Sequence, residues 1–389
     1  MLPLDAFAKV CADVRPGEDA DQVDGLTPPV VAAPATLDEA SAVMRTAAEH
    51  GLAVVPSGTG SKLGYGRPVE RCDVLVTTRN LDGIIKHSPG DLTLHVEAGL
   101  TFEALRETEA DGWGQHLALR PPENGTIGGA IATDVAGPGR LLHGSARDLL
   151  IGITTVRADG TIARAGGKVV KNVAGYDLGK LYTGSLGTLG LIVDATFRMH
   201  PAARAVRVAV VTDDPGRAVQ AVLHSQVVPR AIEIDRPAGS DETTVAVEAE
   251  TETPDETSAR LHELLGGTPA PEPDWWNRLP EGEVLAEIRS LPARLPEIIK
   301  AVKDLPLRGS AGAGRLYTTP DYTTPDGVEE LREALKPIGA RVVLVRAPLA
   351  VRKSVDVWGP LPTLPIMRRV KDQFDPDHRL SPGRFAEGV

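Results

Sequence analysis

The chain has 389 residues, enough for two or three domains at the usual ~100–200 residues each. Its 53 acidic residues outnumber 42 basic ones, and the formal net charge of −11 argues against a general nucleic-acid binder, although a local basic pocket remains possible. Two cysteines, Cys11 and Cys72, are too few for a Cys-rich zinc site, an iron–sulfur cluster or a disulfide framework.

The N-terminal residues MLPLDAFAKV lack a basic start and carry Asp5 where a signal peptide would be apolar. No apolar run approaches the ~20 residues that a membrane-spanning helix needs. We therefore expect a cytoplasmic protein, peripheral to the inner membrane face at most and then only through partners.

The first half of the chain alternates strands and helices. A strand at 30–34 precedes a helix at 37–49, whose apolar residues recur at helical spacing. A buried strand at 52–56 leads directly into the glycine loop PSGTGSKLGYG (56–66). Further strands follow at 73–78, 83–87 and 92–99, and Thr101 is placed to cap the helix after them.

The next segments combine a glycine turn, a hairpin and a long strand. GTIGGAIA (125–132) begins a helix near Ile127, and a β-hairpin turns at residues 158–161. A short helix is expected near 176–183, followed by the turn GSLGTLG (184–190) and a strand to Met199.

From residue 206 the pattern changes to two successive strand–helix–strand–strand arrangements. This order predicts one antiparallel sheet with helices on one face. The segment 251–282 is rich in Pro, Glu and Thr, so we expect it to be a mobile excursion with Trp275 and Trp276 exposed. The last thirty residues form a separate C-terminal helix and tail.

Several common motifs are absent. After Gly58 and Gly60 the next glycine, Gly64, is one residue too far for G-x-G-x-x-G, and no P-loop, H-E-x-x-H or G-x-S-x-G sequence occurs. These absences argue against a nicotinamide Rossmann enzyme, a P-loop NTPase, a zincin and an α/β-hydrolase.

Three glycine-rich segments remain, at 56–66, 125–129 and 184–190. Each could be only a tight turn that needs positive φ. Their hydroxyl side chains, and the N-cap position of Thr126, equally suit backbone N–H groups that bracket a pyrophosphate. An acidic protein could hold a dinucleotide in this way.

Five ordered motifs carry a family resemblance: PSGTGSK (56–62), GTIGGAIA (125–132), GSARD (144–148), KNVAGYD (171–177) and GSLGTLG (184–190). Together they resemble the FAD-binding domain of the vanillyl-alcohol-oxidase/PCMH flavoproteins, and within that superfamily the E-type FAD-binding subunit of bacterial glycolate oxidase. The resemblance is strong over 30–201 and looser at FDPDHRLSPGR (374–384).

This resemblance implies an α+β fold in which a PCMH-type, two-subdomain FAD-binding domain precedes a smaller antiparallel-sheet cap domain with helices on one face. We expect the FAD-binding domain at 1–204, the cap at 205–355, and a C-terminal helix and tail at 356–389 that return to the FAD domain.

The resemblance also implies roles for individual residues. The 56–62 loop and the Thr126–Gly129 turn would hold the FAD pyrophosphate through backbone N–H groups, with Thr133 and Asp134 near the ribityl chain or isoalloxazine. The G-x-x-R-D step would lie beside the flavin, and the strand entry at 187–192 would receive the adenine side. The expected cofactor-binding residues are Pro56, Ser57, Gly58, Thr59, Gly60, Ser61, Lys62, Thr126, Ile127, Gly128, Gly129, Thr133, Asp134, Gly144, Arg147, Asp148, Gly187, Gly190 and Ile192. Arg147 and Asp148 could equally form an intradomain salt bridge.

Some members of the superfamily attach the flavin covalently through His or Cys near the first glycine loop. Residues 56–66 contain neither, which predicts non-covalent FAD. We expect no metal site. Members that oxidise α-hydroxy acids also carry an H-x-G-D-G-N-x-H-like motif in the cap, which this chain lacks. The catalytic residues are therefore unknown, with His143 a weak candidate for proton transfer.

Cationic residues near the expected flavin have two interpretations. Arg140, Arg147, Lys168 and Lys171 could neutralise the pyrophosphate and nearby carboxylates, or stabilise an anionic reduced flavin. Possible carboxylate clamps in the cap are Arg230, Arg236, Arg289, Arg308 and Arg315.

Three functions remain open. The first is a flavoprotein subunit of a glycolate-oxidase-like (2-hydroxy acid dehydrogenase) complex, which passes electrons between flavin and an iron–sulfur partner beside a second FAD-binding subunit. The second is a self-sufficient FAD-dependent 2-hydroxy acid oxidase or dehydrogenase, and the third is a flavin-retaining assembly scaffold.

Overall fold

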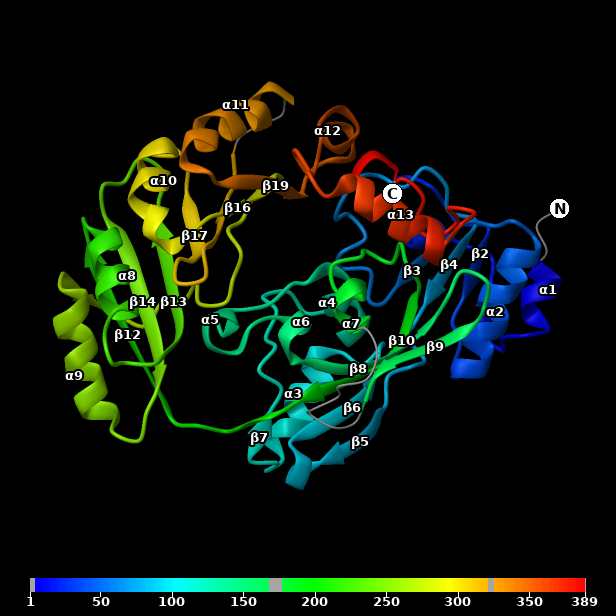
Figure 1. The fold of residues 1–389 in the computed structure, drawn as a ribbon, viewed down its shortest axis with the longest axis horizontal. Coiled ribbons are helices and arrows are strands. Elements are labelled where there is room, and N and C mark those ends of the chain that lie inside the picture. The colour runs from blue at the N-terminus through cyan, green and yellow to red at the C-terminus, as the bar shows by residue number, and fades with distance from the viewer. Residues whose placement is uncertain (1–3, 168–176, 321–324, 389) are drawn as a thin grey trace. The chain divides into compact units, whose positions relative to one another are not determined.

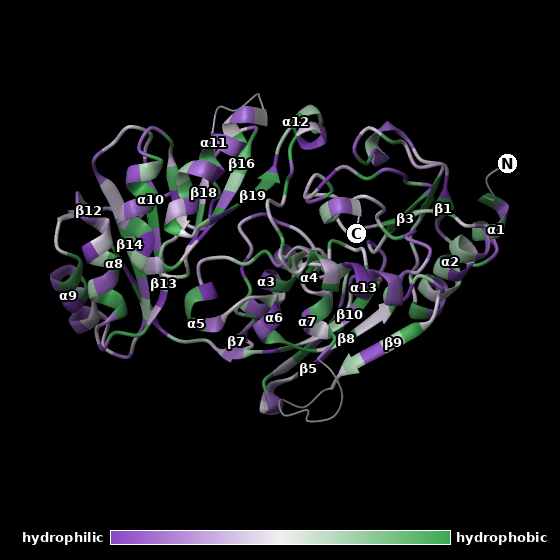
Figure 2. Cartoon of the chain, turned by 45° about the horizontal axis from the view of Figure 1, so that its top comes forward, coloured by the Kyte–Doolittle hydropathy of each residue, from purple (hydrophilic) through white to green (hydrophobic). Residues whose placement is uncertain are grey.

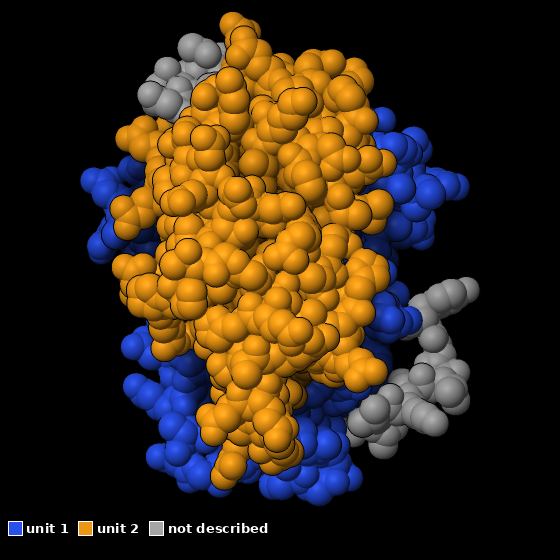
Figure 3. Space-filling view, turned by 90° about the vertical axis from the view of Figure 1, so that its left-hand side faces the viewer, with its two compact units in different colours: residues 1–135, 145–201, 360–389 blue, residues 136–144, 202–359 orange. Residues whose placement is uncertain are grey.

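The structure is a computed structural model that describes residues 4–167, 177–320 and 325–388 (Figure 1). It divides into two compact units, which Figure 3 distinguishes by colour. Unit 1 comprises residues 1–135, 145–201 and 360–389, and unit 2 comprises 136–144 and 202–359. The chain thus changes unit at 201/202 and 359/360, and residues 136–144 are an excursion into unit 2.

Unit 1 contains two main sheets. The first has the order β1 (Val14–Arg15), β2 (Val30–Ala32), β4 (Val74–Thr77), β3 (Val54–Ser57), and its last three strands are parallel. The second is antiparallel, with the order β5 (Ile84–Ser88), β6 (Thr93–Glu97), β10 (Leu191–Arg198), β8 (Leu150–Val156), β9 (Ile162–Gly166). A two-stranded pair joins β7 (Gln115–His116) to β11 (His200–Pro201).

Short helices connect these strands. They are α1 (Leu4–Ala8), α2 (Leu37–Glu49), α3 (Phe102–Ala110), α4 (Ile127–Thr133), α6 (Ala146–Leu149), α7 (Gly179–Tyr182) and α13 (Leu364–Phe374). The buried face of α2 packs with β2, β3 and β4 and with the apolar ends of β8 and β10. Because apolar residues of both sheets share this core, the glycine loop that follows β3 is anchored on a rigid base.

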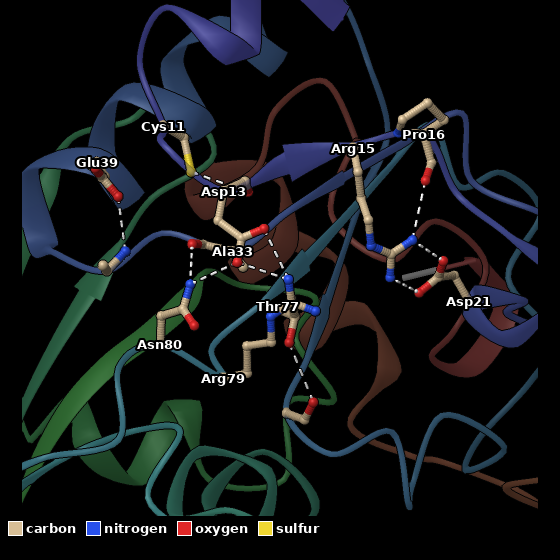
Figure 4. Close-up of polar contacts among 12 residues, drawn as sticks. Cys11, Asp13, Arg15, Pro16, Asp21, Ala33, Glu39, Thr77, Arg79 and Asn80 are labelled. Carbon is tan, nitrogen blue, oxygen red and sulfur yellow. Dashed lines mark hydrogen bonds and ion pairs between the residues drawn. The ribbon is translucent and has the colours of Figure 1, made fainter.

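Polar contacts fix the N-terminal segment on this base. Asp13 accepts hydrogen bonds from Arg79 at 2.8 Å and from Asn80 at 3.0 Å, and Arg15 pairs with Asp21 at 2.6 Å (Figure 4).

The C-terminal tail completes unit 1. Leu380 forms a parallel bridge with Val54, and Arg379 donates to the Leu52 carbonyl at 3.2 Å. Residues more than 300 positions apart in sequence therefore lie side by side next to β3.

Unit 2 is built on one eight-stranded antiparallel sheet with the order β15-β12-β14-β13-β17-β18-β16-β19. The strands are β12 (Ala205–Thr212), β13 (Pro229–Arg236), β14 (Thr243–Glu250), β15 (Thr268–Ala270), β16 (Leu285–Arg289), β17 (Leu307–Ser310), β18 (Arg315–Thr318) and β19 (Arg341–Arg346). The helices of this unit are α5 (Arg140–His143), α8 (Pro215–Leu223), α9 (Pro254–Leu265), α10 (Leu295–Ala301), α11 (Pro325–Leu335) and α12 (Leu349–Ser354).

Helices α8, α9, α10 and α11 supply apolar residues to a single core with alternate residues of the strands. Figure 2 shows these helices as mixed in hydropathy, as expected for helices that bury one face. The opposite face of the sheet carries charged residues, because side chains alternate along a strand.

The expectation of a mobile excursion with exposed tryptophans at 251–282 is wrong for Trp275 and Trp276. Both are half-buried, with the Arg207 guanidinium 4.0 Å from the Trp276 ring centroid and that of Arg308 5.8 Å from the Trp275 centroid. The same segment also forms α9 and the edge strand β15. Composition suggested a flexible loop, but cation–π contacts hold the tryptophans.

Candidate cofactor site

Unit 1 has a cavity, open to solvent, where the three glycine-rich segments meet. The expected cofactor residues that line it are Pro56, Ser57, Gly58, Thr59, Gly60, Ser61, Lys62, Thr126, Gly128, Gly129, Thr133, Gly187, Gly190 and Ile192. The fold thus brings together residues from positions 56 to 192.

The loop after β3 offers a row of backbone donors. The N–H groups of residues 58–62 donate to no group in the part of the chain that the structure describes. The positive φ of Gly60, 80°, turns this backbone without a side chain in the way. Successive backbone N–H groups that have no acceptor within the protein form a concave anion-binding site in such a turn. This loop therefore suits a pyrophosphate.

The start of α4 behaves differently from our expectation. Ile127 N–H donates to the Leu100 carbonyl at 2.9 Å, and Gly128 N–H donates to the Ala98 carbonyl at 2.8 Å. Gly129 N–H donates to Thr126 Oγ1 at 3.1 Å, as an N-cap requires. These N–H groups already donate to acceptors within the protein. The turn therefore lets its backbone lie close to a ligand in the cavity, but it does not supply hydrogen-bond donors for one. Sequence could not reveal this, because the acceptors lie on another segment.

Two glycines explain how the segments come so close. A Cβ built on Gly58 would lie 2.3 Å from Thr126 Oγ1, so a side chain at this position would force the two segments apart. Gly187 has a φ of 74°, and its Cβ would lie 3.2 Å from the Pro56 ring. The glycine loop therefore contacts both other segments through positions that lack side chains.

Two cationic side chains line the cavity. The Lys62 ammonium lies 3.2 Å from Ser61 Oγ and 3.7 Å from the Glu123 carboxylate, and burial lowers the pKa of Lys62. Arg384 lies 3.0 Å from Asp24 and donates to the Tyr65 carbonyl at 3.0 Å. Lys62 is suited to neutralising an anion that enters the cavity, whereas the charge of Arg384 is met by Asp24.

Arg384 was not among the expected site residues, nor were Ser381, Leu186 and Leu191, which also line the cavity. Arg384 and Ser381 belong to the C-terminal segment FDPDHRLSPGR, so its resemblance to the family's ending was the available signal. Leu186 and Leu191 sit among the expected glycines.

Five expected residues lie outside the cavity lining: Ile127, Asp134, Gly144, Arg147 and Asp148. Ile127 is fully buried in the core, and Asp134 ends α4 in a left-handed conformation with a φ of 52°. Asp148 accepts from Ser145 N–H at 2.9 Å as part of a capping box on α6. The exposed side chains of Arg147 and Asp148 are both described, and no ion pair joins them.

His143, the weak catalytic candidate, ends α5 in unit 2. It is buried, and its Nε2 lies 3.4 Å from Glu250 Oε1 on β14. Arg140 also belongs to unit 2. Lys168 and Lys171, like most of the KNVAGYD motif, lie outside the described residues.

The possible carboxylate clamps have partners within unit 2. Arg236 is buried and donates to four backbone carbonyls, those of Ser240, Val302, Lys303 and Leu305, so it anchors the C-terminal end of α10. The other four arginines are ion-paired: Arg230 with Glu248, Arg308 with Asp235, and both Arg289 and Arg315 with Glu287.

The two cysteines are structural. Cys11 and Cys72 are buried in apolar clusters, and burial raises the pKa of Cys72 to about 12. A thiol with so high a pKa is a poor nucleophile. Among the described residues, no group of three His, Cys, Asp or Glu side chains could hold a metal ion, and no helix is long and apolar enough to cross a membrane.

Residues 28–166 match the protein family described as FAD binding domain. The chain is 31% identical over 221 residues to glycolate oxidase subunit GlcD of Bacillus subtilis, covering 54% of this chain and 46% of that protein. It is 37% identical over 163 residues to glycolate oxidase subunit GlcE of Escherichia coli, covering 39% of this chain and 43% of that protein. It is 31% identical over 222 residues to a D-lactate dehydrogenase of Archaeoglobus fulgidus, covering 54% of this chain and 48% of that protein. The chain thus spans less than half the length of these relatives.

The fold is similar to that of a solved alkyldihydroxyacetonephosphate synthase, with a TM-score of 0.67 at 16% identity over 91% of this chain and 77% of that one. The expected α+β fold, with an FAD-binding domain and an antiparallel sheet with helices, is confirmed.

Proposed function

We propose that this chain binds FAD non-covalently and is the flavoprotein subunit of a glycolate-oxidase-like complex that oxidises a 2-hydroxy acid. In that complex it passes electrons between flavin and an iron–sulfur subunit, beside a second FAD-binding subunit. Two relatives that are named as glycolate oxidase subunits support the assignment.

The loop at 58–62 is the observation that carries the proposal. The N–H groups of this loop, which have no acceptor among the described residues, would bind the diphosphate of FAD, and Lys62 would neutralise part of the charge of the diphosphate. Leu186, Leu191 and Ile192 give the cavity an apolar wall that suits an aromatic ring. Bound FAD would supply the redox chemistry, by accepting and passing on the electrons that substrate oxidation in the complex releases.

The side chains of this chain favour electron transfer over independent turnover. Oxidation of an α-hydroxy acid needs a base for the hydroxyl proton, and such a base contributes about 10²–10⁴-fold to the rate. His143 is buried beside Glu250, and the candidate clamp arginines have partners. With only two cysteines, both buried, an iron–sulfur cluster would need ligands from another subunit.

Anaerobic stopped-flow spectroscopy of the purified, FAD-loaded chain tests this function. We expect dithionite to bleach the flavin, and glycolate and D-lactate to leave it oxidised over the same period. Bleaching by glycolate at many turnovers per second, lost in His143→Ala but retained in the exposed control His50→Ala, would make this chain the catalyst and contradict the proposal.

Co-purification from the native host separates a transfer subunit from a scaffold. A transfer subunit copurifies with a second flavin and with iron–sulfur absorbance, and its own flavin is reduced when the complex receives substrate. Flavin in this chain that stays oxidised while the complex turns over would favour the scaffold.

A further inference from the structure

Lys62 is a buried cation in the wall of the cofactor cavity. It lines the cavity, yet its side chain is only 8% exposed. Burial disfavours the charged form of an amine, and it lowers the pKa of Lys62. A lysine that gives up its proton in the empty cavity no longer attracts an anion. The charge of Lys62 therefore depends on support from a neighbouring group.

One carboxylate supplies that support. Glu123 Oε2 lies 3.7 Å from the Lys62 ammonium and accepts a hydrogen bond from the Tyr65 hydroxyl at 3.1 Å. The lysine and the tyrosine thus converge on the same oxygen atom. The charge of Glu123 favours a higher pKa of Lys62 and so opposes the effect of burial. Among the described residues that line the cavity are Lys62 and Tyr65 but not Glu123, so the carboxylate stands behind the lysine.

The space for the ammonium group comes from Gly125, two residues after Glu123. A Cβ built on Gly125 would lie 3.0 Å from Lys62 Nζ and 3.2 Å from Ser61 Oγ. Ser61 Oγ in turn accepts a hydrogen bond from the ammonium at 3.2 Å. The segment 123–125 thus provides both the counter-charge for Lys62 and the room in which its ammonium lies.

Glu123 is the charged group that acts on this lysine. In the part of the chain that the structure describes, burial and Glu123 are the influences on the pKa of Lys62. Arg384 also lines the cavity, and its guanidinium lies 3.0 Å from Asp24. Tyr65 is the other titratable group in contact with the carboxylate, and both Tyr65 and Glu123 make further contacts beyond this trio.

We propose that Glu123 is a positioning residue for FAD binding, which keeps Lys62 protonated in the empty cavity and holds its ammonium ready for the diphosphate. Tyr65 fixes the carboxylate in this arrangement. The distance of 3.7 Å is longer than the ~2.7–2.9 Å of a charged hydrogen bond, so the ammonium can exchange Glu123 for a closer phosphate oxygen. The inference rests on the proposed binding of FAD and adds a residue that acts on the cofactor only through Lys62.

The competing explanation is a purely structural ion pair that ties residues 123–125 to the glycine loop. Glu123→Gln separates the two explanations, because an amide keeps the shape and an acceptor for Tyr65 but removes the charge. A structural role predicts that this variant changes the affinity for FAD by the same factor at every pH. Support of the Lys62 charge predicts a change in the pH dependence itself.

Titration of the FAD-free full chain with FAD, between about pH 6 and 9.5, measures this dependence. The diphosphate favours the ammonium form, so affinity is complete below the pKa of Lys62 in the empty cavity and falls as the pH rises through it. We expect this fall to begin about one pH unit or more lower in Glu123→Gln than in the wild type, as for loss of an opposite charge within ~4–6 Å. Glu103→Gln is the control: Glu103 accepts from Asn124 of the same segment at 2.8 Å, and its loss should leave the profile unchanged.

Lys62→Arg identifies the titrating group. A guanidinium stays protonated throughout this pH range, so Glu123→Gln in the Lys62→Arg background should not move the profile. Parallel profiles for the wild type and Glu123→Gln would overturn the proposal. A shift of the same size in the Lys62→Arg background would overturn it as well.

A titration without FAD decides the inference separately from the proposed function. Carbon-13 magnetic resonance of the lysine-labelled, FAD-free full chain follows Lys62, which is assigned by the loss of its signal in Lys62→Arg. Its pKa should be lower by about 1 or more in Glu123→Gln. An unchanged pKa would overturn the inference even if FAD binds. A lowered pKa in a chain that binds no FAD at any pH would contradict the proposed function, and with it the role in FAD binding, while the support of the Lys62 charge by Glu123 stands.

Discussion

Gly58 and Thr126 touch across the cavity: a Cβ on Gly58 would lie 2.3 Å from Thr126 Oγ1. Gly58→Ala should therefore push the loop away from α4 and weaken FAD binding at least tenfold, since overpacking costs typically ~1–3 kcal/mol. Flavin content and FAD titration measure the effect. Gly64→Ala is the matched control, because a Cβ there meets nothing within 4 Å. Equal FAD affinity in the two variants would contradict the close contact.

Gly129→Val tests the cavity itself. A Cβ on Gly129 meets only Thr126 Oγ1, at 3.2 Å, and the residue lines the cavity. We expect a folded protein that has lost FAD, because the branched side chain would occupy the space of the cofactor. Circular dichroism and flavin absorbance measure the two properties separately. Full flavin occupancy in this variant would show that the site lies elsewhere.

Non-covalent attachment makes a simple prediction. Acid or heat denaturation of the yellow protein should release all flavin into the supernatant, since residues 56–66 contain no His or Cys. Absorbance of the pellet and the supernatant after centrifugation decides the outcome. Flavin that remains with the precipitated protein would mean a covalent bond.

The C-terminal helix α13 is anchored by a buried cation. Lys371 Nζ donates to Asp375 at 2.7 Å, to the Thr188 carbonyl at 2.8 Å and to the Leu380 carbonyl at 2.9 Å. Lys371→Met leaves Asp375 buried without its partner, so we expect a loss of about 3–5 kcal/mol in the free energy of unfolding. Lys336→Met breaks an exposed pair with Glu333 and should cost under about 1 kcal/mol. Urea denaturation compares them, and similar losses would contradict the role of burial.

Glu233 makes the stability of unit 2 depend on pH. Burial raises its pKa to about 8, and the charge of Glu248 adds to the shift. The folded state therefore binds a proton that the unfolded state releases above its ordinary pKa, so this contribution is complete at low pH and is lost as pH rises towards 8. Glu233→Gln should match the wild type near pH 4 and exceed its stability by on the order of several kcal/mol at pH 9. Thermal melts across this range measure the difference, and a constant offset between the proteins would contradict the assignment.

Local pattern was sufficient for most elements of the fold. The helical spacing at 37–49, the Thr101 and Thr126 caps and the hairpin after β8 all occur as predicted, because each depends on neighbouring residues alone. The strand order of the second half likewise gave one antiparallel sheet with helices on a single face.

Composition was less informative than contacts between distant residues. Trp275 and Trp276 looked exposed in a polar segment, yet arginines from β12 and β17 cover their rings. Arg236 looked like a ligand clamp, but it donates to the carbonyls at the end of α10. In each case the partner comes from another element and leaves no local trace in the sequence.

The sequence by itself determined the family resemblance, the three glycine segments and the absence of His and Cys from residues 56–66. These features depend on residue identity, because a position where the chain turns sharply or approaches a ligand closely requires a particular residue type. Only the tertiary structure decided which backbone N–H groups remain available, because hydrogen bonds from Ile127 and Gly128 go to a segment brought alongside by folding. It also decided that Arg289, Arg315 and Arg341 share one row, since strand register sets which residues lie opposite each other.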